Sequence, residues 1–243
     1  MTLRGDHAPS GLAPFGWAGF RRGFRLGTAL SFAIFIYGLA FGLVAAQVSL
    51  GWGWALATSV SVFSGSAQLA SLSLMQTGEA TVWTLAATVL VINARYLLFG
   101  ATLQPWLSQA GPARAYASLL LLGDANWIAT MRAAEKGEQD RAYLLGTGVP
   151  LMAAWLAGTL AGVLFGGILP DPHALGADLM LPCFAAAMMA AMVRSRAALV
   201  PVAVGATAAL LISHFAGPGW GIVAAGLAGA GVAALTARPG VVK

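Results

Sequence analysis

Charged residues are scarce in this sequence. Asp, Glu, Lys and Arg together make up 9% of its 243 residues, whereas hydrophobic residues make up 59%. A soluble domain carries about 25% charged residues, so this shortage excludes an ordinary water-soluble fold. A run of about 20 apolar residues crosses a bilayer as a helix, and the chain has several such runs. The composition therefore predicts an all-α integral membrane protein embedded in the lipid bilayer.

Groups that could carry chemistry are equally few. Cys183 is the only cysteine and there are three histidines, which excludes an internal disulfide and argues against a metal site. The sequence contains no nucleophile elbow, no zinc-protease motif and no phosphate-binding loop. We therefore expect no catalytic residues, no cofactor, no enzymatic activity and no hydrolysis of ATP by this chain.

The net charge of +5 has an explanation in the membrane. Basic residues gather between the apolar runs, where the positive-inside rule places them on the cytoplasmic side, so they do not indicate nucleic-acid binding. Eight spans with both termini in the cytoplasm place eleven of the basic residues inside, Arg114 outside and Arg95 within the membrane. One span more or fewer before the seventh would leave a basic loop outside.

The apolar runs predict one polytopic helical bundle. We expect residues 1–25 to form a cytoplasmic N-terminal tail, residues 26–237 a single transmembrane domain, and residues 238–243 a cytoplasmic C-terminal tail. Short turns rich in Gly, Pro or charge separate the spans. The eight predicted spans are 26–47, 55–75, 81–103, 115–131, 143–169, 179–193, 198–215 and 220–237.

A weak internal repeat is visible in these spans. Gly38 and Gly42 form a Gly-x-x-x-Gly pair in the first span, and Gly158 and Gly162 form another in the fifth. Such pairs let two helices approach closely. The second pair lies four spans after the first, which suggests parallel repeats of the kind found in some transporters.

The second predicted span carries an unusual number of polar side chains. Ser61, Ser64, Gln68 and Ser71 are three, four and three residues apart, so on a continuous helix they share one face. Gly65 lies within this run, where it allows a close backbone approach or a loosened helix. A polar face has few partners in lipid. Two interpretations stay open: small residues that hold helices together, or the lining of a substrate path.

Arg95 and Asp124 are ionisable residues inside predicted spans. Each costs about 2.5–3.5 kcal/mol on insertion scales, so such residues are functional candidates by default. Asn93 and Asn126 each lie two residues away, about 200° around a regular helix. The four side chains therefore need polar neighbours on two sides, or a local break in each helix. The alternative is a purely structural ion pair between the third and fourth spans.

Several motifs stand out together along the chain: Ala40-Phe-Gly-Leu43, Phe63-Ser-Gly-Ser-Ala-Gln68, Asn93-Ala-Arg95-Tyr-Leu-Leu98, the region of Asp124 and, more weakly, Leu181-Pro-Cys-Phe184. Over about residues 32–132 these motifs resemble the AzlC family. Family members usually have Ala at position 64 and Asp-Glu where this chain has Asp124-Ala125, so the second carboxylate is missing here.

The resemblance implies the large subunit of a bacterial branched-chain amino-acid transporter, generally an exporter. It implies a multi-pass protein of the bacterial plasma (inner) membrane, with a small AzlD-like membrane subunit as partner. A zwitterionic substrate needs a donor for its carboxylate and an acceptor for its ammonium. We expect Arg95 or backbone N–H groups near Gly65 to supply the first, and Asp124 or serine hydroxyls the second.

We therefore expect a secondary transporter subunit that exports small neutral, branched-chain amino acids. An uncoupled channel or facilitator for a small solute is the alternative, and a non-transporting membrane scaffold is a third class, which the buried charges disfavour. The predicted substrate-binding and translocation residues are Ser61, Ser64, Gly65, Gln68, Ser71, Asn93, Arg95, Asp124 and Asn126.

The distribution of basic residues predicts that residues 171–178 face the outside and residues 132–141 face the cytoplasm. The variants Gly137→Cys and Ala174→Cys, each in a Cys183→Ala background, report on this arrangement. An impermeant maleimide should label position 174 in intact cells and position 137 only after lysis. Labelling of position 137 from outside would contradict the eight-span arrangement.

Overall fold

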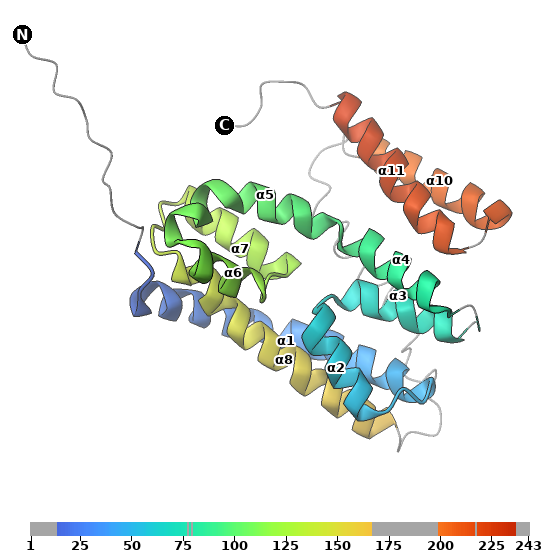
Figure 1. Cartoon of the computed structure of the whole chain (residues 1–243), viewed down its shortest axis with the longest axis horizontal. Coiled ribbons are helices and arrows are strands. Elements are labelled where there is room, and N and C mark those ends of the chain that lie inside the picture. Colours follow the sequence, from blue (N-terminus) through green and yellow to red (C-terminus); the bar gives the residue numbers. More distant parts are fainter. Residues whose placement is uncertain (1–13, 77, 79, 167–198, 217, 237–243) are drawn as a thin grey trace, which may run out of the picture.

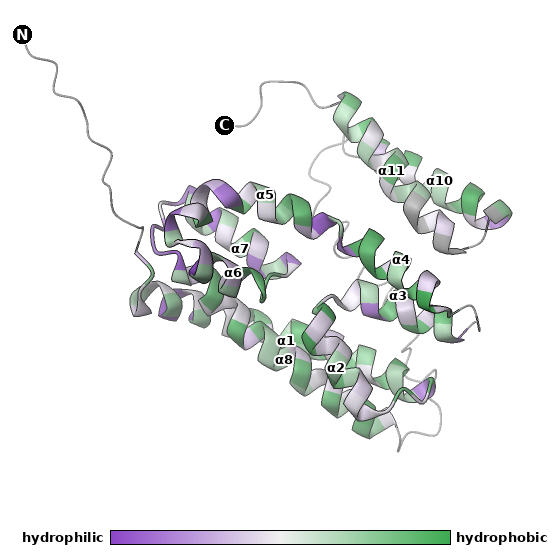
Figure 2. Cartoon of the chain, in the orientation of Figure 1, coloured by the Kyte–Doolittle hydropathy of each residue, from purple (hydrophilic) through white to green (hydrophobic). Residues whose placement is uncertain are grey.

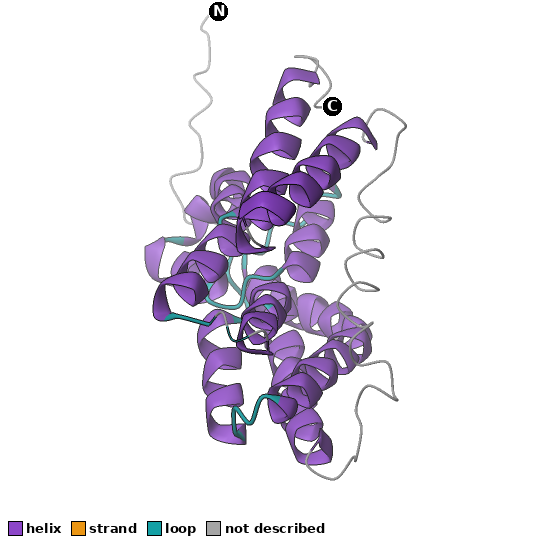
Figure 3. Cartoon of the chain, turned by 90° about the vertical axis from the view of Figure 1, so that its right-hand side faces the viewer, coloured by secondary structure: helices purple, strands orange, loops and turns teal. Residues whose placement is uncertain are grey.

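The computed structural model describes residues 14–76, 78, 80–166, 199–216 and 218–236. Within these residues every regular element is a helix and no strand occurs (Figure 3). Three described segments are long and apolar enough to cross a membrane: Trp17–Gln47, Val82–Ala110 and Ala142–Gly166. The described chain is thus all-helical and has the character of a membrane protein.

From α1 to α8 the helices follow one another with short connections (Figure 1). The predicted span 179–193 lies outside the described residues. The elements are α1 (Trp17–Gln47), α2 (Trp52–Val62), α3 (Gly65–Gln76), α4 (Val82–Asn93), α5 (Arg95–Leu107), the 3₁₀ turn η1 (Ser108–Ala110), α6 (Pro112–Leu119), α7 (Asp124–Glu135), α8 (Ala142–Gly166), α10 (Leu199–Ala216) and α11 (Pro218–Thr236).

The first and fifth predicted spans are single helices. The first ends at Gln47 as expected but begins earlier, so residues 17–25, assigned to the N-terminal tail from sequence, are helical. The fifth corresponds to α8, which runs through Pro150 without a break. The last two spans correspond to α10 and α11, which pack on each other.

Of the three predicted spans between the first and the fifth, the second and the fourth are each broken in two, so their prediction as continuous helices is wrong. The second breaks between α2 and α3, where Phe63 has a left-handed backbone with φ +40°, a conformation that is rare for a bulky residue. The third runs over Val82–Ala110, long enough to cross a membrane; it is interrupted at Ala94, between α4 and α5, where the backbone stays helical with φ −53° and ψ −27°. The fourth breaks between α6 and α7, where Gly123 caps α7.

Helices α1 and α8 form the core of the fold. They run parallel, as two contacts show. Near the start of α1, Gly19 donates a hydrogen bond to Asp140, which lies just before α8, and late in α1, Gly42 lies against Thr159, which is late in α8. A Cβ atom on Gly42 would overlap the Thr159 carbonyl oxygen, and one on Gly162 would overlap that of Leu39. The glycine pairs thus bring backbone directly against backbone.

These contacts are reciprocal between the two helices. A Cβ atom on Gly38 would lie 2.6 Å from the Trp155 carbonyl oxygen, and one on Gly158 would overlap the carbonyl oxygen of Phe35. Each glycine therefore meets the residue three positions before the opposing glycine. Two equivalent helices related by a twofold axis would make the same pattern.

Asp140 joins the two helices where both begin. Its carboxylate accepts hydrogen bonds from the backbone N–H groups of Gly16 (3.0 Å), Gly19 (2.9 Å) and Ala142 (3.1 Å), so one side chain caps α1 and α8 together. Hydrophilic residues gather at this end of the molecule (Figure 2).

A second carboxylate stabilises the same end. Arg22 donates two hydrogen bonds to Glu138, at 2.8 and 2.7 Å, and this guanidinium holds the pKa of Glu138 below its usual range. Arg141 contacts α5 and η1 instead: it donates hydrogen bonds to the Trp106 carbonyl oxygen and to Gln109, each at 2.7 Å. The segment before α8 therefore connects α1 to the end of α5.

The packing of α1 on α8 predicts that added methyl groups in the seam destabilise the protein. Gly42→Ala or Gly162→Ala forces the backbones apart, which we expect to cost about 1–3 kcal/mol and to lower the temperature at which the purified protein loses its monodisperse gel-filtration peak. Gly100→Ala in α5 is the control, because its Cβ atom would enter open space. Equal melting of all three variants would show that the seam tolerates separation.

Candidate functional site

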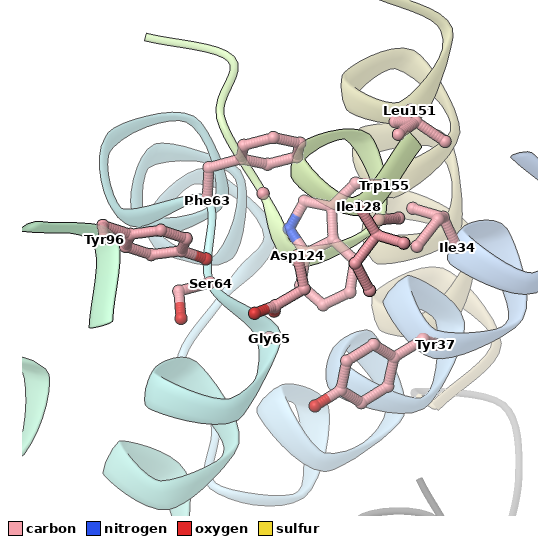
Figure 4. A pocket seen from close by; sticks show the side chains of 12 residues that line it. Ile34, Tyr37, Phe63, Ser64, Gly65, Tyr96, Asp124, Ile128, Leu151 and Trp155 are labelled. Atoms are coloured by element: carbon pink, nitrogen blue, oxygen red, sulfur yellow. The ribbon is translucent and has the colours of Figure 1, made fainter. Parts of the chain in front are cut away.

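A cavity of about 250 Å³ lies where the broken helices meet α1 and α8 (Figure 4). Drug-sized ligands occupy pockets of about 300–1,000 Å³, and one water molecule takes about 30 Å³, so this space suits a small solute. Its apolar wall is formed by Ile34, Phe63, Ile128 and Leu151, and its polar groups belong to Tyr37, Ser64, Tyr96, Asp124 and Trp155.

Two of the helix breaks open directly onto this cavity. Ser64 and Gly65 line it where α3 begins, and Gly123 and Asp124 line it where α7 begins. The first N–H groups of a helix have no partner within the helix, and the end carries partial positive charge. Backbone of this kind is tolerated at membrane depth only inside protein or beside a wet cavity.

Gly65 permits the close approach of two aromatic rings. A Cβ atom at this position would overlap the ring of Tyr37 and lie 2.8 Å from the six-membered ring of Trp155. Any other residue would push these rings away from the start of α3. Gly65 therefore lets Tyr37 and Trp155 pack directly against the start of α3.

An ion pair stands at the edge of the cavity. Arg95 Nη2 lies 3.0 Å from Asp124 Oδ2 and donates a hydrogen bond of 2.9 Å to Ser66 Oγ. The guanidinium also lies 5.3 Å from the centre of the Tyr96 ring, a favourable cation–π distance. The side chains of Arg95 and Asp124 keep 30% and 20% of their surface exposed, and Asp124, but not Arg95, is among the residues that line the cavity.

Asn126 stabilises the turn before α7, which positions Asp124. Its Oδ1 accepts a hydrogen bond from the Gly123 N–H at 2.7 Å, and its Nδ2 donates to the Leu121 carbonyl oxygen at 2.7 Å. Asn126 is fully buried and does not line the cavity. It holds the start of α7 in place, so that Asp124 occupies the first position, where a carboxylate is stabilised by the helix end.

The break at Phe63 divides the polar face predicted over the second span. Ser64 alone among its four members lines the cavity. The hydroxyls of Ser61 and Ser71 donate to carbonyl oxygens of their own helices, each at 2.8 Å. Gly65, predicted as a loosening point within this face, lines the cavity with Ser64.

Gln68 belongs to a separate polar seam between α2, α3 and α8. Its Nε2 donates to Ser59 Oγ at 3.2 Å and to Thr58 Oγ1 at 3.3 Å, and Ser59 Oγ lies 3.1 Å from Thr159 Oγ1. These side chains hold helices together. The packing interpretation therefore applies to Gln68, whereas Ser64 lines a cavity and the substrate path stays a prediction.

The remaining predicted residue, Asn93, is the last residue of α4 and lies next to the break at Ala94. It is half-buried and does not line the cavity. Arg95, the first residue of α5, contacts Ser66 in α3 and Asp124 in α7. The sequence offered a local break as one way to satisfy all four polar side chains, but Asn93 Oδ1 is buried and has no hydrogen-bond partner among the described residues.

Sequence reasoning missed four residues at the site. Tyr37, Tyr96 and Trp155 line the cavity, and Ser66 accepts the hydrogen bond from Arg95. Ser66 lies off the predicted polar face and faces Arg95 only because the helix breaks before it. Tyr96 had a signal, its position next to a charged residue within a span, whereas the aromatic residues in α1 and α8 are indistinguishable by pattern from core residues.

The comparison with protein-family models decides the family. The model described as AzlC protein matches residues 29–169, more than half of the chain. The chain belongs to the AzlC family. No curated protein and no solved structure gives a match. The residues that line the cavity run from Ile34 to Trp155, so the whole site lies within the AzlC match, whereas α10 and α11 lie outside it.

The ion pair predicts distinct behaviour for single and double variants. Arg95→Leu or Asp124→Leu leaves one charge without its partner, which costs about 3–5 kcal/mol in a fully buried pair and less here, because both side chains are partly exposed. We expect each single variant to lose monodisperse protein after extraction. The double Leu variant should recover folding and remain inactive in amino-acid efflux.

The control for this comparison is Arg132→Leu, which removes an exposed charge from α7 and should behave as the unmodified protein does. A double variant with unchanged efflux would assign the pair a structural role alone. Single variants as stable as the control would show that the two charges do not depend on each other.

Proposed function

We propose that this protein is the large subunit of a secondary transporter that exports small neutral, branched-chain amino acids across the bacterial plasma membrane. The observation that carries the proposal is a cavity that joins an apolar wall to an Arg95–Asp124 pair at the breaks of discontinuous helices. Discontinuous helices with substrate sites at their breaks are a recurring design of secondary transporters. Membership of the AzlC family supports a role in transport.

The chemistry of the cavity suits a zwitterion with an aliphatic side chain. Ile34, Phe63, Ile128 and Leu151 offer an apolar surface that would gain about 25 cal/mol for each Å² of side chain removed from water. Asp124 offers an acceptor for an ammonium group. A strongly charged side chain on the substrate would find no counter-charge on the apolar wall, which favours neutral amino acids.

The parallel arrangement of α1 and α8 supports the predicted order of the spans. Two parallel spanning helices start from the same side of a membrane, so an odd number of spans lies between them, as with the three spans predicted between the first and the fifth. The reciprocal glycine contacts are those that parallel repeats would make. We further propose a small AzlD-like membrane subunit as partner, since helix α4 has no buried residue and offers an apolar surface to lipid or to another chain.

An uncoupled facilitator is the rival function, because the same cavity would also suit passive flow of a small solute. The two differ in their response to an ion gradient. A scaffold without transport is disfavoured, since a paired charge beside a cavity has no use in a purely structural helix bundle.

Efflux from proteoliposomes tests this function. Vesicles loaded with radiolabelled leucine, isoleucine, valine or lysine should release the three branched-chain amino acids faster than lysine, when the chain is reconstituted together with its small subunit. An imposed proton gradient should change the rate. Release that ignores every imposed gradient would favour the facilitator, and the absence of release of any amino acid would reject the proposed function.

A further inference from the structure

Trp155 presents an unpaired donor to the cavity. The side chain is 3% exposed, and its Nε1–H has no hydrogen-bond partner among the described residues. Figure 4 shows the indole nitrogen turned towards the space between Phe63, Ser64 and Asp124. A buried N–H group without a partner is unfavourable and rare in folded proteins, so its presence in a cavity wall indicates that a ligand supplies the acceptor.

The start of α3 offers further donors to the same space. The first hydrogen bond inside this helix runs from the Gln68 N–H to the Ser64 carbonyl oxygen (2.9 Å), which leaves the preceding N–H groups without a partner in the helix. Gly65 brings this helix end within contact distance of the Trp155 ring. A helix N-terminus combined with an indole N–H is a site for an anionic group.

The acceptor for a cation lies near the start of α3. Asp124 lines the cavity from the start of α7, and Arg95 Nη2 contacts both its carboxylate (3.0 Å) and Ser66 Oγ in the first turn of α3 (2.9 Å). Donors and a carboxylate therefore lie close together, as the carboxylate and ammonium groups of an α-amino acid do. The apolar wall of Ile34, Ile128 and Leu151 completes the lining.

We propose that Trp155 Nε1–H and the first N–H groups of α3 bind the carboxylate of the amino acid, while Asp124 binds its ammonium group. The inference rests on the proposed function and names the residue that recognises the carboxylate. Trp155 is then a specificity residue: it selects solutes that carry an α-carboxylate, and the size of the cavity limits the side chain attached to it.

The test compares Trp155→Phe with the unmodified protein. Phenylalanine keeps an aromatic ring against Tyr37 and Phe41, whose rings lie 5.3 and 5.9 Å from that of Trp155, but removes the N–H. The dissociation constant for leucine, measured by scintillation proximity on the purified complex, should rise about tenfold or more. The constant for isoamylamine, which is leucine without its carboxylate, should change little.

Trp127→Phe is the matched control. It also removes an indole N–H, but that group donates to Thr102 at 2.9 Å, and Trp127 does not line the cavity. Leucine binding by this variant should equal that of the unmodified protein. Equal loss of leucine and isoamylamine binding in Trp155→Phe, or no loss of either, would overturn the inference.

A measurement on the unmodified protein keeps the test independent of how well Trp155→Phe folds. Leucinamide replaces the carboxylate with a neutral amide, so it should bind about tenfold more weakly than leucine. Leucinamide that binds as tightly as leucine would overturn the recognition of the carboxylate. If leucine neither binds nor leaves proteoliposomes, the proposed function fails as well, whereas efflux with unaltered binding by Trp155→Phe rejects this inference alone.

Discussion

The direct contact of backbone on backbone between α1 and α8 is the constraint on which the rest of the structure depends. At Gly42 and Gly162 there is no room for a side chain, so the two helices have one distance and one register. Asp140 then caps both helices with a single carboxylate, and Tyr37 and Trp155 meet edge to face. The wall of the cavity formed by α1 and α8 is therefore rigid, and the broken helices are arranged against it.

The helix ends inside the fold and the Arg95–Asp124 pair supply polar partners in the same region. A helix that stops within a membrane leaves backbone groups without partners, which lipid cannot satisfy. A lone arginine or aspartate at that depth is costly. Here Arg95 is the first residue of α5, after the interruption at Ala94, and the cap at Gly123 makes Asp124 the first residue of α7. The two charges meet where Asp124 lines the cavity.

The sequence contained much of this fold but little of the cavity. Composition predicts an all-helical membrane protein, the glycine pairs predict close packing, and the two ionisable residues inside spans offer an ion pair between Arg95 and Asp124. The sequence offered a local break near Arg95 and Asp124 and a loosened helix at Gly65, but it did not predict that α2 ends at Phe63, because Phe63 is not a residue that stops a helix; tertiary packing overrides local preference there. Nothing in an apolar pattern separates Trp155 from an ordinary core residue.

The Arg95–Asp124 pair also decides how the cavity interacts with an electric field. Two opposite charges 3.0 Å apart give the site no net charge, and a zwitterion adds none when it binds. Moving one elementary charge across a membrane involves about 2.3 kcal/mol per 100 mV, so a solute of this class moving through a neutral site performs no electrical work. If the transport rate depended on the membrane potential, that dependence would then come from a coupled ion. The steepness of the dependence would report the charge that this ion carries across the membrane.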